Sequence, residues 1–521
     1  ACPTGLRARL LTMLRPRVGL LEIARRAPPF VTRTSYRTSS HAAAVSRGVR
    51  GYEQALERNW GGNVWFGAAQ VHEPRTLAEL QASVRDAAAP CRVVGRGHSF
   101  SPVAECAGGT LLSLRHMNGI LDFEAPAAGG LGWITVEGGT TYTEIARFLD
   151  GRGALRNLPS CPQFTVAGAI ATGTHGSGVH IQGLACDVRM LEFVRGDGSL
   201  VSYSREESPE LLEGARVHLG CLGVVSRLSL DVVPYYDVAR YAYVDVPLEP
   251  AVTSLPRLWR ACDSLSMWTS GFGTGPGAGK CWLQFRHFHP HYDPAVAVPE
   301  HTPLDGAMLG DGTSLLSGNV NRYCTEVEQP ETFRPTGRAP WHSGLTLTLD
   351  DEARETSMAV WDIQAEFFVE LQHAQAAIRA VWAAASERAW SFSSPWGDAG
   401  PPVKGLVDAM EFRQVKGDGA WLSPQPVDAL GIHVSFNGDP AMRPEVLRAL
   451  PVLEQALEPF RPRHHWGKCA QLTGSPAWVE SCYGERLRSF RALCDVHDPT
   501  GKFRNRHLNE MLFGNVKMRP S

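Results

Sequence analysis

The sequence lacks several features that would assign it to a simple class. Its twelve cysteines are scattered from Cys2 to Cys494 without one Cys-x-x-Cys pair, which argues against a zinc site and against a compact disulfide framework. No apolar run is long enough to span a bilayer. The chain also lacks an excess of one charge, because 51 Lys and Arg residues nearly balance 53 Asp and Glu residues in number. A near-neutral chain gives no reason to expect a nucleic-acid partner. The 521 residues leave room for two domains.

The first fifty residues lack lysine and almost lack acid. They contain ten arginines, no lysine and one acid, Glu22. Arg15 and Arg17 interrupt what could be the apolar core of a secretory signal. An Arg-rich, Ser-rich, acid-poor leader is typical of a mitochondrial transit peptide. We therefore expect a mitochondrial protein in which residues 1–50 are a targeting leader and Met13 is the true start. A disordered basic tail and a chloroplast address are the alternatives.

The remaining chain predicts short helices among many strands. Thr76 and Thr141 each stand three residues before a glutamate, Glu79 and Glu144, in the capping-box pattern that begins a helix. This mixture favours an α+β fold over the regular alternation of a doubly wound sheet. The other predicted elements are strands at 133–137, 188–194, 200–203, 224–233, 408–415 and 431–436, and helices at 356–385, 443–460 and 476–494.

Two glycine-rich segments are the first candidates for ligand binding. The segment 95–102 reads Gly-Arg-Gly-His-Ser-Phe-Ser-Pro, and the segment 168–178 reads Gly-Ala-Ile-Ala-Thr-Gly-Thr-His-Gly-Ser-Gly. Glycine lacks Cβ and lets backbone N–H groups approach phosphate oxygens closely. Neither segment fits the Gly-x-Gly-x-x-Gly pattern of a nicotinamide site. Together they could clasp a long dinucleotide from two sides.

With three further stretches, these segments resemble the FAD-binding domain of the vanillyl-alcohol-oxidase flavoproteins, and among them the aldonolactone oxidases. The stretches are 215–224, Glu411-Phe412-Arg413 and His465-Trp466-Gly467-Lys468, with Asp-Pro-Thr-Gly-Lys-Phe at 498–503 closing the series. The resemblance covers roughly residues 55 to 513. It implies an FAD-binding domain of the PCMH type at 51–235, a substrate-binding cap domain at 236–462, and a C-terminal segment at 463–521 that completes the flavin site.

The resemblance also implies which residues hold FAD. His98 matches the histidine that bonds covalently to the flavin. Pro159 matches a position beside the reactive edge of the flavin, where oxidases carry Gly or Pro, and it therefore favours oxygen as the electron acceptor. The cofactor-binding residues implied are Gly95, Arg96, Gly97, His98, Ser99, Pro159, Gly168, Thr172, Thr174, His175, Gly176, Val224 and Lys468.

Glu411, Arg413 and Lys468 are the predicted catalytic residues. Glu411 and Arg413 stand two apart in a predicted strand, so both side chains point to one face. A solvated ion pair is the ordinary interpretation of such a pair, but the resemblance implies that both bind substrate. The guanidinium of Arg413 would hold a lactone carbonyl or hydroxyls. Glu411 would accept a hydroxyl hydrogen bond or its proton. Lys468 would stabilise charge on the reduced flavin. His433 is either a pocket-lining residue or a core histidine.

The function implied is FAD-dependent oxidation of an aldono-1,4-lactone at C2. The products would be ascorbate or an analogue, and hydrogen peroxide from oxygen. L-galactono-, L-gulono- and D-arabinono-lactone all stay open as substrates. A mitochondrial galactonolactone dehydrogenase that uses cytochrome c and an assembly role in a respiratory complex are the alternatives. Peripheral membrane association stays open.

Three closely spaced histidines lie outside these motifs and have to be considered as metal ligands. His287, His289 and His291 alternate within a Gly/Pro/His-rich stretch at 271–340 that we interpret as loose. No carboxylate framework accompanies them, and their spacing fits no metal motif. We predict a polar loop there and no metal site.

Overall fold

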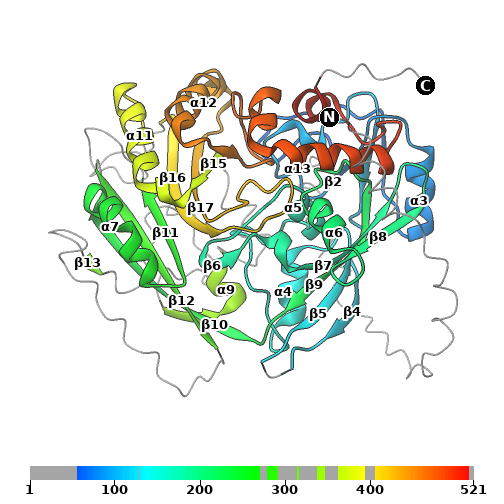
Figure 1. Cartoon of the computed structure of the whole chain (residues 1–521), viewed down its shortest axis with the longest axis horizontal. Coiled ribbons are helices and arrows are strands. Elements are labelled where there is room, and N and C mark those ends of the chain that lie inside the picture. The colour runs from blue at the N-terminus through cyan, green and yellow to red at the C-terminus, as the bar shows by residue number, and fades with distance from the viewer. Residues whose placement is uncertain are drawn as a thin grey trace.

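The computed structural model describes residues 56–127, 129–269, 279–290, 314–315, 337–346, 362–392 and 405–514. Within these ranges three sheets and their covering helices account for most of the regular structure (Figure 1). The mixture of helices and mostly antiparallel strands confirms the α+β prediction. No helix in the described ranges combines the length and the apolar character that crossing a membrane requires. The leader at 1–50 lies outside the described residues.

Two of the sheets come from the first half of the chain. A small parallel sheet has the order β1 (Gln70–His72), β3 (Thr110–Ser113), β2 (Cys91–Val94). An antiparallel five-stranded sheet has the order β4 (Ile120–Glu124), β5 (Gly132–Glu137), β9 (Val224–Val232), β7 (Val188–Val194), β8 (Leu200–Ser204).

The third sheet contains ten of the described strands. Eight of them follow the order β13 (Ser314–Leu315), β10 (Tyr236–Pro247), β12 (Lys280–Pro290), β11 (Ser264–Thr269), β16 (Val407–Lys416), β17 (Ala429–Asn437), β15 (Asp362–Glu370), β18 (Arg463–His464). β14 (Gly337–Pro340) pairs with β10, and β6 (Gly178–Gln182) pairs with β16.

The helices are mostly short and lie on the sheets. In chain order they are α3 (Leu77–Asp86), α4 (Tyr142–Leu149), α5 (Val166–Ala171), α6 (Pro209–Arg216), α7 (Leu248–Arg260), α9 (Trp341–Leu345), α11 (Ala374–Glu387), α12 (Arg443–Leu457), α13 (Pro476–His497) and α14 (Arg506–Leu508). Short helical turns lie at Pro102–Ala104, Leu184–Asp187, Leu371–His373, Pro440–Met442, Glu458–Phe460 and Asn509–Phe513.

The ten-stranded sheet has one apolar and one polar face. α7, α11 and α12 cover the apolar face, where Met267, Phe285, Phe412 and Ile432 pack into one buried cluster (Figure 1). Side chains alternate along a strand, so the residues between these positions point to the other face. That face carries Glu411, Arg413 and other polar groups. The helices therefore fix the strands while leaving the polar face available for chemistry.

Several predicted elements are confirmed by the structure. The predicted strands at 408–415 and 431–436 correspond to β16 and β17, and those at 188–194 and 200–203 to the paired strands β7 and β8. The helices predicted at 443–460 and 476–494 correspond to α12 with its following turn and to α13. At Thr141 the complete capping box is present.

The helix predicted at 356–385 is wrong in its first part. Residues 356–361 lie outside the described residues, and 362–370 form strand β15 before α11 begins at Ala374. Ile363, Ala365 and Phe367 point into the apolar cluster, so the period of this segment is two. The alanine-rich pattern of α11 was extended backward across a strand.

The loose stretch predicted at 271–340 also needs correction. Its residues 280–290 form β12, which pairs with β10 and β11. His287 and His289 therefore lie in a strand and not in a loop, whereas His291 lies outside the described residues. Cys281, Leu283 and Phe285 supply the alternating buried positions that define the strand.

The boundaries predicted near residues 235 and 462 stay predictions. The change from the five-stranded to the ten-stranded sheet falls between β9 and β10. One strand crosses this division, because β6 from the first half runs parallel to β16, with Gly178 opposite Val415. The chain of the second glycine-rich segment thus enters the large sheet directly.

Candidate active site

The first glycine-rich segment forms a tight turn after β2. Gly97 has a φ of +69°, a left-handed conformation that glycine adopts without strain. The backbone N–H of Trp60 donates to the carbonyl of Gly97 over 2.7 Å. The ring of His98 lies against two aromatic rings, with its centroid 5.6 Å from that of Trp60 and 4.7 Å from that of Phe164. Arg96 lies half-buried in the same turn.

The turn packs against two distant segments. A Cβ at Gly95 would lie 2.2 Å from the hydroxyl oxygen of Thr165, so only glycine allows this approach. The N–H of Phe100 donates to the carbonyl of Gly467 over 2.7 Å. A Cβ at Gly467 would lie 3.2 Å from the hydroxyl of Ser99. The sequence-distant Gly-x-Gly and His-Trp-Gly-Lys motifs are therefore neighbours.

The second glycine-rich segment follows α5. The hydroxyl of Thr172 donates to the carbonyl of Gly168 over 3.2 Å and lies 3.3 Å from the hydroxyl of Thr174. Gly173 has a φ of +70°, and a Cβ at Gly176 would lie 2.1 Å from the amide oxygen of Asn157. In both turns, glycine therefore allows the backbone to pack against a neighbouring side chain, Thr165 at Gly95 and Asn157 at Gly176.

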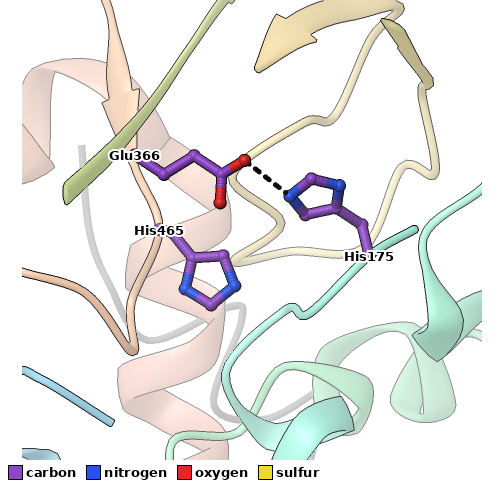
Figure 2. Close-up of side chains that lie close together, drawn as sticks. All are labelled: His175, Glu366 and His465. Carbon is purple, nitrogen blue, oxygen red and sulfur yellow. Dashed lines mark ion pairs between the residues drawn. The ribbon is translucent and has the colours of Figure 1, made fainter. Parts of the chain in front are cut away.

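Glu366 joins the second glycine-rich segment to the predicted catalytic residues. Its Oε1 lies 3.2 Å from Nε2 of His175 and accepts a hydrogen bond from Arg413 over 2.9 Å. Its Oε2 accepts a hydrogen bond from the Lys468 ammonium over 2.7 Å. Figure 2 shows His175 and His465 pointing toward Glu366 from separate segments. Lys468 and Arg413, which lie in separate sequence motifs, thus meet on one buried carboxylate.

The strand pairing places these side chains in a row on the polar face. Glu411 on β16 lies opposite His433 on β17, and His433 lies opposite Glu366 on β15. Directly opposed residues of antiparallel strands have their side chains on the same face. Oε2 of Glu411 lies 3.3 Å from Nε of Arg413 and 3.8 Å from Nδ1 of His433. Gly431, opposite Arg413, leaves room for Glu366, since a Cβ there would lie 3.2 Å from Oε1 of Glu366.

The electrostatics of the row keep Glu366 charged and His433 neutral. Burial alone would raise the pKa of Glu366, but the charges of Lys468, His175 and Arg413 outweigh it and hold that pKa well below its usual value. Burial, followed by the charge of Lys468, holds the pKa of His433 well below its usual value. Both ring nitrogens of His433 are buried and lack a hydrogen-bond partner among the described residues. His433 therefore offers a neutral nitrogen to a ligand.

The three residues drawn in Figure 2 also have the composition of a metal site. One ligand atom from each of His175, Glu366 and His465 lies within 4.8 Å of the others. Arg413 and Lys468, however, already donate to both oxygens of Glu366. A divalent cation would have to approach two fixed positive charges, and we assign the cluster to charge pairing. The predicted absence of a metal site stays a prediction.

The other predicted residues lie around these segments. Val224 is buried at the start of β9 in an apolar cluster, and Pro159 is buried. His287 and His289 lie on β12, away from the row's strands β15 to β17. Sequence reasoning missed Glu366 because its strand was interpreted as a helix. The alternation of polar and apolar residues in 362–369 was the signal that could have revealed it.

Comparison with known proteins identifies the family. A model described as FAD binding domain matches residues 68–204, and one described as D-arabinono-1,4-lactone oxidase matches residues 355–511. The chain is 33% identical to the alditol oxidase of Streptomyces sp. strain IKD472 over 460 residues, which are 88% of this chain and 99% of that protein. The chain belongs to the FAD-dependent aldonolactone oxidase family. It is thus an oxidoreductase of the vanillyl-alcohol-oxidase group, with a PCMH-type domain that binds FAD.

Other members of the aldonolactone oxidase family match shorter parts. The L-gulonolactone oxidase of Mus musculus is 31% identical over 199 residues, 37% of this chain and 44% of that protein. The D-arabinono-1,4-lactone oxidase of Eremothecium gossypii is 32% identical over 216 residues, 40% of each chain. The chain therefore spans less than half of these two lactone oxidases and nearly all of the alditol oxidase.

The residues present fit FAD as the family cofactor. Gly95 and Gly176, where a Cβ would collide with Thr165 and Asn157, let the two turns pack closely against those side chains, and both turns lie within the residues that the FAD-binding model matches. The hydroxyls of Ser99, Thr172 and Thr174 supply donors for a pyrophosphate. The set of residues that the resemblance implies for FAD binding stays a prediction: Gly95, Arg96, Gly97, His98, Ser99, Pro159, Gly168, Thr172, Thr174, His175, Gly176, Val224 and Lys468.

Proposed function

We propose that this protein oxidises an aldono-1,4-lactone at C2 with oxygen as the electron acceptor, giving ascorbate or an analogue and hydrogen peroxide. One observation carries the proposal: Arg413 and Lys468 donate to the buried carboxylate of Glu366, and Glu411 and His433 lie beside them on the same face of the sheet. The names of the lactone oxidases from Mus musculus and Eremothecium gossypii support the choice of substrate class.

The residues of the row have distinct roles in this reaction. Bound FAD supplies the acceptor for a hydride from the substrate carbon and the route of two electrons to oxygen. Arg413 and Lys468 hold the substrate oxygen by charge-assisted hydrogen bonds. His433 takes the hydroxyl proton, because its neutral ring has two unpartnered nitrogens among the described residues. Glu411 accepts a hydrogen bond from a neighbouring hydroxyl and orients the substrate.

Oxidation of an acyclic alditol is the second candidate. The specific observation in its favour is the length of the similarity to the Streptomyces alditol oxidase, which extends over 99% of that protein. The row itself suits either substrate, since both present a CH–OH carbon with a neighbouring hydroxyl.

Oxygen uptake by the purified holoenzyme tests the proposal. The panel contains L-galactono-, L-gulono- and D-arabinono-1,4-lactone beside xylitol, sorbitol and glycerol. Uptake with a lactone, and its loss in Glu411→Ala and Arg413→Ala, is the expected result. Uptake with alditols alone selects the second candidate. Slow reoxidation by oxygen of anaerobically reduced enzyme, together with fast reduction of cytochrome c, overturns the oxidase assignment.

We further propose that FAD is bound covalently through His98. The support is the position of His98 in the turn between Trp60 and Phe164 and the family resemblance of its motif. Protein that stays yellow after denaturation in acid or urea is the expected result, with His98→Ala losing its colour under the same treatment. Equal loss of colour from both proteins refutes the covalent bond. Mitochondrial import is a separate proposal, which a fusion of residues 1–50 to a fluorescent reporter tests.

A further inference from the structure

The polar face of the ten-stranded sheet continues beyond the catalytic row. Ser266 on β11 lies opposite Arg413 on β16, and Gln284 on β12 lies opposite Ser266. Arg286, two residues along β12, lies opposite Ser264. All of these side chains therefore share the face that carries Glu411 and Arg413.

Arg286 is held in place by this extension. Its guanidinium donates to the hydroxyl of Ser266 over 3.1 Å and to the amide oxygen of Gln284 over 2.5 Å. Ser266 and Gln284 are themselves 1% and 4% exposed. Two fixed acceptors on neighbouring strands thus hold one terminal nitrogen of the guanidinium each, and Nε lacks a partner among the described residues.

The guanidinium of Arg286 lacks a counter-ion among the described residues. Both hydrogen-bond acceptors of Arg286 are neutral, and among the described residues no ion pair joins it to a carboxylate. Its Nε is buried and unpartnered in that part of the chain, as is Nε2 of Gln284. An uncompensated buried cation is costly, and such groups accumulate where a ligand completes them. An oxygen acceptor is the group that would complete the hydrogen bonding of Arg286 Nε and Gln284 Nε2.

Charges of both signs act on Arg286. Burial lowers the pKa of Arg286 to about 10, the carboxylate of Glu411 opposes this effect, and the charge of Arg413 adds to it. A carboxylate on the substrate would meet repulsion from Glu411, whereas hydroxyl groups can accept from Arg286 and donate to Glu411.

We propose that Arg286, positioned by Ser266 and Gln284, binds the hydroxyls at the end of the substrate remote from the carbon that is oxidised. The proposal rests on the second candidate function, oxidation of an alditol, and deepens it, because a subsite at Arg286 makes the site selective for long polyhydroxylated chains. Gln284 is two strands away from Arg413, a separation of about 10 Å between strand axes. Xylitol carries hydroxyls on two more carbons than glycerol does, so the longer chain alone would place a hydroxyl at Arg286 while its other end contacts Arg413.

The test separates binding from chemistry. Anaerobic stopped-flow reduction of the holoenzyme by xylitol and by glycerol gives an apparent Kd and a limiting rate constant for each. Arg286→Ala should raise the Kd for xylitol by about tenfold to a hundredfold, the effect of losing a hydrogen bond from a charged donor. The Kd for glycerol and both limiting rate constants should stay within about twofold of wild type. A rise shared equally by the two alditols, or a fall in the rate constants alone, overturns the proposal.

A second measurement does not depend on turnover. Calorimetric titration of xylitol and glycerol into the prereduced holoenzyme under nitrogen should show tighter binding of xylitol, and Arg286→Ala should abolish this preference. If neither alditol and no lactone reduces the wild-type flavin, the proposed function fails, while a preference lost in Arg286→Ala still supports the subsite. Wild-type protein without a preference for xylitol overturns the subsite.

Matched variants guard against a folding defect. Arg338 lies on β14 in the same sheet, opposite Ala239 and therefore on the other face, and pairs with Asp237 over 2.7 Å. Arg338→Ala should leave both Kd values unchanged. Should Arg286→Ala fail to bind flavin, Gln284→Met and Arg286→Lys replace it and should raise the Kd for xylitol selectively. A larger effect on D-gluconate than on xylitol would mean a carboxylate subsite and overturn the assignment to hydroxyls.

Discussion

The substitution Glu366→Gln tests the central role of a residue that no motif revealed. Glu366 is 1% exposed, and its oxygens face Arg413 and His175 on one side and Lys468 on the other. Glutamine keeps the shape but replaces one oxygen by an NH2 group. Wherever that group points, it faces a cationic donor, so a hydrogen bond becomes a donor–donor contact and the cluster gains one positive charge.

The expected effects are large for an isosteric change. Removing one partner of a buried charge network costs about 3–5 kcal/mol of unfolding free energy. Displacing Arg413 and Lys468 by as little as an ångström costs about a hundredfold in rate. We therefore expect the limiting rate of anaerobic flavin reduction to fall by about two orders of magnitude. Stopped-flow reduction and guanidinium chloride unfolding measure the two effects separately.

Glu370→Gln is the matched control. Glu370 ends the same strand, is exposed and accepts a hydrogen bond from Gln372 over 2.9 Å. This variant should keep both the reduction rate and the stability of the wild type. The reasoning is refuted if Glu366→Gln reduces flavin within about threefold of the wild-type rate and unfolds at the same denaturant concentration.

Three further predictions follow from buried polar groups. His433→Asn should slow flavin reduction at least a hundredfold, on the order of one lost general base. Because the pKa of His433 lies well below its usual value, the wild-type rate should show no inflection near the ordinary histidine pKa. His464 and His497 have pKa values of about 4. As the pH falls below about 6.5, these two histidines become protonated in the unfolded chain but stay neutral in the folded one. Each histidine should therefore lower the free energy of unfolding by about 2 kcal/mol between pH 8 and pH 5, which urea unfolding measures. Arg92→Lys should lose about 3 kcal/mol, because Arg92 donates to the carbonyls of Val103, Leu219, Gly220 and Phe503.

Each of these predictions has a clear opposite. An acid limb near pH 6.5 in the reduction rate would assign the proton to a group with an ordinary pKa instead of His433. Equal unfolding free energies at pH 8 and pH 5 would mean that His464 and His497 titrate alike in the folded and unfolded chains. Unchanged melting of Arg92→Lys would show that a single ammonium satisfies the carbonyls as well as the guanidinium does.

The sequence was sufficient to predict part of the site where the residues that act together are close in the chain and share one strand. Glu411 and Arg413 stand two apart on one strand, and this spacing alone predicted that they share a face, as the structure shows. The segment 95–102 was likewise selected from its own glycine residues, and Gly97 adopts a positive φ within it.

The sequence was insufficient where a residue acts through pairing with a distant strand. Glu366 meets Lys468 across 102 positions, and nothing in either local pattern encodes that contact. Arg286 was hidden for the same reason, since its role depends on Ser266 being its neighbour across β11 and β12. His287 and His289 were misplaced because proline and glycine around them outweighed the alternation of Cys281, Leu283 and Phe285.

The crossing strand β6 has a consequence for how such proteins can be recombined. It begins two residues after Gly176 and pairs with the last residues of β16, and Gln182 donates to the carbonyl of Gly417 over 2.8 Å. The N–H of Val179 also donates to the carbonyl of Asp263 over 2.8 Å. A chimera joined near residue 236 would take its cofactor half and its substrate half from different parents, yet the pairing of β6 with β16 needs residues of both halves. Exchange of the substrate half alone should therefore fail unless β6 is taken from the same parent.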